Sequence, residues 1–300
     1  MFVRIATRAS ALARWQADHV AALLRAAEPS CTVEVVPLST EGDRRTDVPL
    51  SEIGGKGVFA TEVQAALLDG RADVAVHSAK DLPARTPDGL VIAAVPERGD
   101  PRDALVGCRL VDLPTDATVA TGSARRRVQL AHLRPDLRFA ELRGNMATRL
   151  EKAAGFDAIV VAAVALERLG LADRLDDVLP ATLLVPQVAQ GALAVECVAD
   201  RRDLRELLAR IEHGPSRSAV DVERAFLDEL GGDCSLPAGA HATLLDDGLL
   251  RVRGILGGEP DADGRTPVHH GVEVGDGPAA GRALARALRG KAGDPARGAP

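Results

Sequence analysis

The segment TGSARRRVQLAHLRPDLRFAELRGNMATRL, residues 121–150, joins a strand-to-helix pattern to a strong local charge. It holds two acidic side chains and seven arginines, at positions 125, 126, 127, 134, 138, 143 and 149. The whole chain has a formal charge of −6, so these arginines form one concentrated basic patch in an acidic protein. A guanidinium pairs with a carboxylate or phosphate through two parallel bonds, which makes the patch a candidate anion site. The alternative is a pair of helices with solvated arginine faces, which we expect for Arg134 and Arg138.

Strands and helices alternate on both sides of this segment. Ser10 is predicted to cap a helix that runs to about residue 27. Strands are expected at residues 3–7, 32–38, 73–77, 91–95, 104–106, 118–121, 137–142 and 192–197, with a further apolar run at 158–165. This alternation predicts an α/β fold with parallel or mixed sheets covered by helices. From residue 238 the pattern changes to short strands with Gly-Asp turns and a helix near 279–288, which predicts a small α+β domain.

Polar residues gather where three of the predicted strands end. Residues 78–81 follow one strand, residues 121–127 follow a second, and residues 143–149 follow a third. In open α/β sheets, ligands bind outside the carboxyl ends of the strands. Two such units facing each other would form a cleft lined by these turns.

Asp81 and Cys234 are the two side chains best suited to chemistry. Asp81 follows Lys80, and such a pair is more often a structural ion pair than a group that stabilises a cation or moves a proton. Cys234 lies in the glycine-rich turn GGDCSLP, which favours an accessible thiol, whereas Cys31, Cys108 and Cys197 lie on or beside apolar strands. His77 is expected to be a core histidine. The sequence IGGKG, residues 53–57, predicts a mobile loop or a lid that contains Lys56.

Composition argues against several classes of protein. One Trp, no Tyr and a pI near 5.7 argue against a nucleic-acid or membrane surface. The four cysteines show no C-x-x-C spacing, which argues against a zinc site or a disulfide framework. The first residues lack an apolar signal core, and no run approaches the ~20 apolar residues that span a bilayer. We therefore expect a cytoplasmic protein that binds no metal.

Seven motifs occur in a characteristic order: IATRASALARWQA, IGGKGVFATEV, RADVAVHSAKDLP, DPRDALV, TGSARRRVQLA, LRGNMATRL and GGDCSLPAGA. In this order they resemble the porphobilinogen deaminase family, also called hydroxymethylbilane synthases, over roughly residues 3–290. HSAKD together with LRGN-x-x-TRL is a highly specific pair. The resemblance implies two domains like those of periplasmic binding proteins, placed here at residues 1–98 with 188–212 and at 99–187. It implies a third, smaller domain at 213–300 that carries the cysteine, with a disordered tail from about 291.

The family resemblance also implies an activity. Such enzymes join four porphobilinogen molecules head to tail, lose ammonia at each step and release hydroxymethylbilane. The chain grows on a dipyrromethane cofactor held by a thioether, here to Cys234, and Asp81 matches the catalytic aspartate. The expected partners are porphobilinogen and linear polypyrrole intermediates, with no nucleic acid or membrane, and the expected state is a monomer.

Each pyrrole carries an acetate and a propionate, so a growing chain accumulates carboxylates that arginines can hold. Deamination leaves a cation, which a carboxylate such as Asp81 can stabilise. By match to the family's motifs, the residues expected to bind cofactor or substrate are Arg8, Ser10, Gln16, Ser78, Lys80, Thr121, Ser123, Arg125, Arg126, Arg143, Arg149, Arg168 and Gly191.

Four positions depart from the family's usual residues. Gly122 replaces a serine, Ala189 replaces a glycine, and Glu52 stands where some members have lysine. Asp233 precedes Cys234 where glycine is common, and we expect this carboxylate to raise the pKa of the thiol. Two rival hypotheses remain: a non-catalytic two-domain protein that binds a small anion, and a degenerate member that assembles the cofactor without turnover.

Overall fold

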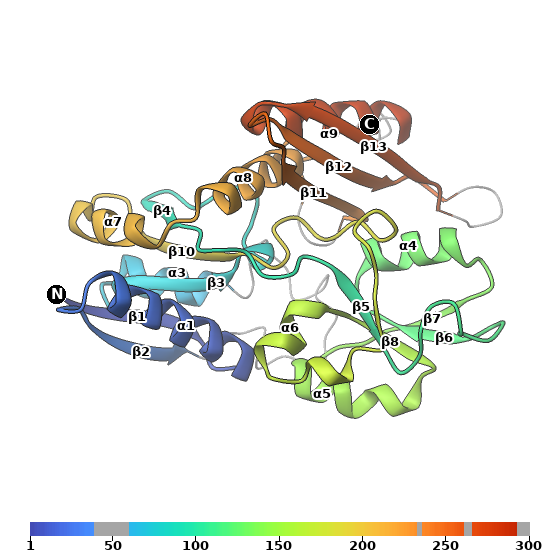
Figure 1. Ribbon diagram of the computed structural model, residues 1–300, viewed down its shortest axis with the longest axis horizontal. Coiled ribbons are helices and arrows are strands. Elements are labelled where there is room, and N and C mark those ends of the chain that lie inside the picture. Colours follow the sequence, from blue (N-terminus) through green and yellow to red (C-terminus); the bar gives the residue numbers. More distant parts are fainter. Residues whose placement is uncertain (39–59, 233–235, 261–265, 293–300) are drawn as a thin grey trace, which may run out of the picture. The chain divides into compact units, whose positions relative to one another are not determined.

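The computed structural model describes residues 1–38, 60–232, 236–260 and 266–292 (Figure 1). The chain divides into two compact units, Met1–Gly99 with Gly191–Arg217, and Asp100–Gln190 with Ser218–Pro300. Lys56, Cys234 and residues 293–300 of the predicted disordered tail lie outside the described residues, whereas residues 291 and 292 close the last helix.

The first unit is built on a mixed sheet with the strand order β2-β1-β3-β10-β4. Its described strands are β1 (Phe2–Arg8), β2 (Thr32–Leu38), β3 (Val74–Ser78), β4 (Leu90–Ala94) and β10 (Leu193–Val198). β1 runs parallel to β2 and β3, whereas β10 lies antiparallel between β3 and β4. The described helices of this unit are α1 (Ala11–Ala27), α3 (Thr61–Leu68) and α7 (Arg202–Leu208).

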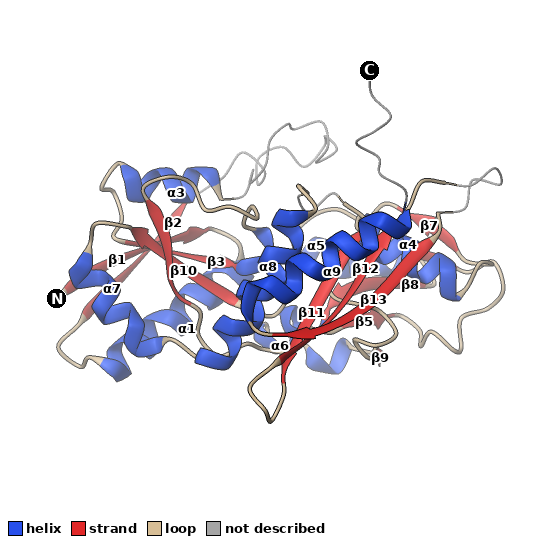
Figure 2. Ribbon diagram, turned by 90° about the horizontal axis from the view of Figure 1, so that it is seen from above, coloured by secondary structure: helices blue, strands red, loops and turns tan. Residues whose placement is uncertain are grey.

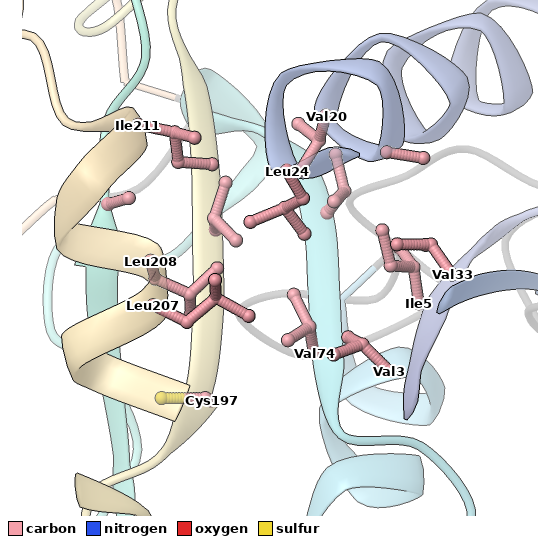
Figure 3. Packing of buried hydrophobic residues seen from close by; sticks show 14 of the residues in the cluster. Val3, Ile5, Val20, Leu24, Val33, Val74, Cys197, Leu207, Leu208 and Ile211 are labelled. Atoms are coloured by element: carbon pink, nitrogen blue, oxygen red, sulfur yellow. The ribbon is translucent and has the colours of Figure 1, made fainter. Parts of the chain in front are cut away.

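Helices pack on both faces of this sheet. As predicted, α1 begins after Ser10, whose hydroxyl accepts a hydrogen bond from the Ala13 amide at 3.3 Å. Val20 and Leu24 of α1 face the strand residues Val3 and Ile5, with Leu207 and Leu208 of α7 in the same cluster (Figure 3). On the opposite face, Val63, Ala66 and Leu67 of α3 pack against Ala6, Ala75 and Leu90. Each fully buried Val or Leu contributes about 1.5–3 kcal/mol to this core.

The second unit repeats the same topology in the order β7-β6-β8-β5-β9. Its strands are β5 (Asp103–Val106), β6 (Thr118–Ala120), β7 (Arg138–Ala140), β8 (Ala158–Ala162) and β9 (Asp177–Val178). β6 is parallel to β7 and β8, and β5 is antiparallel to β8 and β9. In each sheet the antiparallel strand follows a crossing of the chain between units, at Gly99–Asp100 before β5 and at Gln190–Gly191 before β10. The accompanying helices are α4 (Ala124–Leu133), α5 (Met146–Lys152) and α6 (Ala163–Arg168).

The C-terminal part of the second unit is a three-stranded antiparallel sheet with two helices. The elements are α8 (Gly214–Glu229), β11 (Ala238–Leu244), β12 (Leu250–Gly257), β13 (Val268–Gly275) and α9 (Gly277–Ala292). α9 lies along the sheet (Figure 2), with Leu284 and Leu288 over Gly271. Gly281 of α9 lies so close to α8 that a Cβ there would collide with the Val222 carbonyl oxygen, so this packing requires a glycine.

These observations confirm the predicted α/β class, the mixed sheets and the small C-terminal α+β region. One detail was wrong, because the strand predicted at 137–142 covers only Arg138–Ala140. The apolar run at 158–165 forms β8 up to Ala162 and the start of α6 from Ala163. The predicted three-domain boundaries stay a prediction. None of the helices in the described part of the chain combines the length and apolar character needed to cross a bilayer.

The turn before β10 is under backbone strain. Ala189 has a φ of 58°, the left-handed region that L-residues avoid, and Gly191 has a φ of 90°. The Ala189 amide donates to the buried Glu223 carboxylate at 2.6 Å, and Gln190 donates through its side chain to the Pro101 carbonyl at 2.7 Å. These bonds hold the turn in its strained form, in which a glycine at position 189 would be free of strain.

Ala189→Gly should therefore raise the free energy of unfolding by about 0.5–1 kcal/mol. The left-handed conformation costs an alanine about 1–2 kcal/mol, which a glycine avoids. Part of this gain is lost because the unfolded chain has more conformational entropy with glycine than with alanine. Chemical denaturation measures the difference. Ala225→Gly inside α8 is the control of opposite sign and should lower stability by about 1 kcal/mol. Equal destabilisation by both changes would contradict the strain at residue 189.

Candidate functional site

A small pocket of about 60 Å³ lies where β1 and β3 of the first unit end. β1 ends at Arg8 and β3 at Ser78, and because these strands are parallel neighbours their carboxyl ends meet at one sheet edge. The lining residues are Arg8, Ser10, Leu12, Ala13, Gln16, Val76, His77, Ser78 and Asp81. The structure thus gathers five of the predicted site residues, Arg8, Ser10, Gln16, Ser78 and Asp81, in one place.

Local hydrogen bonds fix the turn that carries Asp81. Ala79–Asp81 form a single 3₁₀ turn directly after β3, and the Ala79 amide donates to the Ala192 carbonyl at 3.0 Å. Gln16, buried on α1, exchanges hydrogen bonds with the Ser78 hydroxyl at 2.8 and 3.2 Å. Asp81 and Lys80 are both half-buried. The backbone that leads into Asp81 is therefore anchored, and Asp81 itself lines the pocket.

The pocket combines a cation, hydroxyl groups and a carboxylate. Arg8 and the two serines can donate to carboxylate oxygens, and Asp81 can accept from N–H groups. Such a set fits a ligand that carries both carboxylates and pyrrole N–H groups, as the dipyrromethane does. Among the residues that the structure describes, there is no cluster of three His, Cys, Asp or Glu side chains suited to a metal ion.

The predicted residues of the second unit cluster at the corresponding strand ends. Thr121 follows β6 and is buried, and its hydroxyl accepts from the Ser123 amide at 3.2 Å. Ser123 caps α4 by accepting from the Arg126 amide at 3.5 Å. Between them, a Cβ on Gly122 would lie 3.0 Å from the Leu142 carbonyl oxygen, so a serine there would require a small shift of the neighbouring strand end.

Arg125 and Arg126 form a buried cluster with Asp103, a residue that the sequence analysis missed. The Asp103 carboxylate is 2.7 Å from Arg125 and 2.6 Å from Arg126, and it accepts from Gln190 at 2.9 Å. All three charged side chains are at least nine-tenths buried. Burial alone would raise the pKa of Asp103, but the two guanidinium groups hold it far below its usual range. The binding role of Arg125 and Arg126 stays a prediction, and their observed partner is Asp103.

The remaining predicted arginines differ in their surroundings. Arg143 is partly exposed and lies 3.9 Å from a Glu141 oxygen, while Arg149 donates to the Gly144 carbonyl at 2.9 Å. Arg168 ends α6, and burial lowers its pKa to about 10, so it keeps its charge at neutral pH. Gly191 is buried in the strained turn before β10.

Two arginines expected on solvated helix faces behave differently from each other. Arg138 is exposed and pairs with Asp116 at 3.2 Å, as expected for a surface group. Arg134 is a correction: besides Asp136 it donates to the Leu110 and Leu113 carbonyls, both at 3.1 Å, and so ties α4 to a preceding loop. The sequence showed the charge of Arg134, but not the carbonyl groups that the fold brings to it.

Cys197 is buried, as predicted for a cysteine on an apolar strand. Burial raises the pKa of its thiol to about 11, which leaves it protonated and unreactive at neutral pH. Cys31 is also buried, and Cys108 is half-buried.

Comparison with known proteins identifies related sequences over most of the chain. The model of the "Porphobilinogen deaminase, dipyromethane cofactor binding domain" matches residues 3–206, and that of the "Porphobilinogen deaminase, C-terminal domain" matches residues 218–288. The porphobilinogen deaminase of Chromobacterium violaceum is 47% identical over 289 residues, covering 95% of this chain and 93% of the relative. That of Nitratidesulfovibrio vulgaris is 46% identical over 278 residues, covering 91% and 88%.

The matched sequence thus defines a protein with a dipyrromethane cofactor binding domain followed by a C-terminal domain. More particularly, the chain belongs to the porphobilinogen deaminase family. Among solved structures, the methionine binding protein MetQ is 12% identical with a TM-score of 0.44, covering 72% of this chain and 92% of that protein. A likeness of that size supports no conclusion about ligand.

Asp103→Asn should lower the free energy of unfolding by about 3–5 kcal/mol, because it leaves two buried guanidinium groups without their counter-charge. Asp112→Asn is the control, since its contact with Arg109 is long, at 3.8 Å, and exposed; it should change stability little. Denaturant titrations at neutral pH measure both.

The stability difference between wild type and Asp103→Asn should also depend on pH, in a direction that the pKa of Asp103 determines. The pKa of Asp103 is lowered on folding, so its contribution is present above the ordinary value of 3.8 and is lost as pH falls toward the folded value. The gap in stability between wild type and Asp103→Asn should narrow below that pH. If wild type and Asp103→Asn were equally stable at neutral pH, or if their difference in stability grew in acid, Asp103 would not be the counter-charge of the two arginines.

Proposed function

We propose that this chain joins four porphobilinogen molecules head to tail, releases ammonia at each step and yields hydroxymethylbilane, with a dipyrromethane primer held by Cys234. The observation that carries this proposal is the pocket in which Asp81 lies beside Arg8, Ser10 and Ser78, in a chain of this family. Aspartate in a pocket with a cation and hydroxyl donors suits a ligand with both carboxylates and N–H groups.

Asp81 has the catalytic role in this proposal. Loss of ammonia from the incoming porphobilinogen leaves a positive charge on that pyrrole, and a fixed carboxylate stabilises the charge as it forms. The Asp81 carboxylate can also accept a hydrogen bond from a pyrrole N–H group. Its anchored backbone means that little reorganisation is needed at the moment of reaction.

Basic and hydroxyl side chains hold the acid groups of the growing chain. On the first unit these are Arg8, Ser10 and Lys80; on the second they are Thr121, Ser123, Arg143, Arg149 and Arg168. In the buried cluster, Asp103 compensates only one of the two charges of Arg125 and Arg126, so the cluster keeps a net positive charge beneath α4. Its role is then to attract acid groups through its field, in addition to holding α4 in place.

When bound, the dipyrromethane supplies the pyrrole carbon to which the first substrate is joined. Cys234 anchors it, Lys56 belongs to a lid, and Gly191 lets the backbone turn before β10 approach the ligand. We further propose that the protein is a cytoplasmic monomer, as the family resemblance implies. The acidic pI of about 5.7 and the low aromatic content of 2% support the absence of a nucleic-acid or membrane partner.

Cys234→Ser should abolish the covalent adduct. Intact mass of the purified wild-type chain should exceed the sequence mass by two pyrrole units, and the variant should have the sequence mass alone. Cys197→Ser is the control and should keep the adduct, because Cys197 is buried and protonated. An unmodified mass in folded wild type, with no consumption of porphobilinogen, would favour the non-catalytic anion-binding alternative.

Asp81→Asn should keep the adduct and reduce turnover by roughly 100-fold or more, because the amide cannot balance a developing positive charge. Asp88→Asn, an exposed acid between Asp81 and β4, is the control and should leave product formation unchanged. Asp81→Asn with the turnover of wild type would show that another group carries the charge. A full adduct with turnover absent from wild type as well would indicate the degenerate family member.

A further inference from the structure

Three polar side chains meet in the apolar layer under α3, outside the set assigned above. Gln64 of α3 donates to a Glu196 oxygen of β10 at 2.9 Å, and the same oxygen lies 3.2 Å from the His77 Nε2 atom of β3. Glu196 is fully buried, and Gln64 and His77 are more than nine-tenths buried. Around them lie Val63, Leu67 and other apolar residues of the same core. We call these three residues the Glu196 triad.

The fold alone gives no reason for a carboxylate at this position. A buried ion costs several kcal/mol of desolvation, and apolar residues of similar volume are often as stabilising as a buried ion pair. Of the described residues that are fully buried, Glu196 is the acidic one in the sheet of the first unit. The position of Glu196 next to the Asp81 pocket therefore favours a role in that site.

The triad lies directly behind the Asp81 pocket. His77 itself lines that pocket and precedes Ser78, the last residue of β3. Across the sheet, β10 pairs His77 with Ala194 and Ser78 with Leu193, and the Ala192 carbonyl accepts from Ala79. One strand therefore supports both the His77 side chain and the backbone of the turn that ends at Asp81.

The register of β10 changes at the same residue. Its pairing with β4 shifts between Val195 and Glu196, while its pairing with β3 continues without a shift from Leu193 to Glu196. Such irregularities re-aim a side chain and occur preferentially beside active sites. Here the shift coincides with the carboxylate that meets His77.

We propose that Glu196 is a positioning residue for the Asp81 pocket and acts through His77. Its carboxylate, held by Gln64, contacts the imidazole ring of His77, and β3 transmits that position to Ser78 and Asp81. This inference rests on the proposed function. A displacement of about 1 Å in a catalytic group can reduce a rate by about 100-fold, so loss of the contact should be visible in kcat.

The test is a double-mutant cycle on product formation. Glu196→Gln keeps the size of the side chain and an oxygen for Gln64 but removes the charge, and His77→Leu removes the imidazole. Each change should lower kcat by about tenfold or more, with KM within about twofold of wild type and with the covalent adduct retained. The double variant should be no slower than the slower single variant, because both changes break the same contact.

Asp73→Asn is the matched control. Asp73 precedes the opposite end of β3, where its largely buried carboxylate accepts from Arg4 at 2.9 Å. This change should lower thermal stability and leave kcat unchanged, which separates positioning from general weakening of the sheet. His77→Gln, which restores a polar group beside Glu196, should recover most of the kcat lost in His77→Leu and gives the answer even where Glu196→Gln does not fold.

Three results would overturn the proposal. The first is a Glu196→Gln variant with the same kcat as wild type, and the second is a double variant whose loss of kcat is the product of the two single losses. The third is an Asp73→Asn variant whose kcat falls as much as that of Glu196→Gln. Failure of the proposed function looks different, because wild type itself would then lack turnover, with or without the adduct.

Discussion

The antiparallel pairing of β10 with β3 is the interaction on which the placement of Asp81 depends. β10 begins directly after the chain returns to the first unit at Gly191, and it enters the sheet between β3 and β4. Its first residues hold the end of β3, and the Ala192 carbonyl holds the turn that follows. A segment more than a hundred residues from Asp81 in the sequence thus fixes the backbone that presents the Asp81 carboxylate.

Charge is arranged differently in the two units. In the first, one carboxylate lies in a pocket beside Arg8 and hydroxyl groups. In the second, the arginines divide into a buried pair neutralised in part by Asp103 and a set nearer the surface that includes Arg143. A ligand that is a polyacid and passes through a cation needs both kinds of surroundings: many positive groups for its side chains and one negative group for the reacting ring.

Several features of the fold and of the candidate site were predictable from local sequence signals. Ser10 as a cap, the strand ends within one residue of Ser78 and Thr121, and His77 as a core residue follow from periodicity and short-range chemistry. The insertion of β10 between β3 and β4 was not predictable in that way, because an apolar run such as ALAVEC indicates a strand but not its neighbours. The ion pairs of Arg125 and Arg126 with Asp103 were missed for the same reason. An acid beside the apolar residues ALV was the signal, yet its partners lie more than twenty residues away.

The most direct measurement is a crystal structure of the chain loaded with its dipyrromethane. We expect the Asp81 carboxylate within hydrogen-bond distance of pyrrole N–H groups, ligand carboxylates on Arg8 and Ser10, and β10 paired with β3 in the register described above. A ligand bound elsewhere, with Asp81 turned to solvent and no acid group near Arg8, would contradict it.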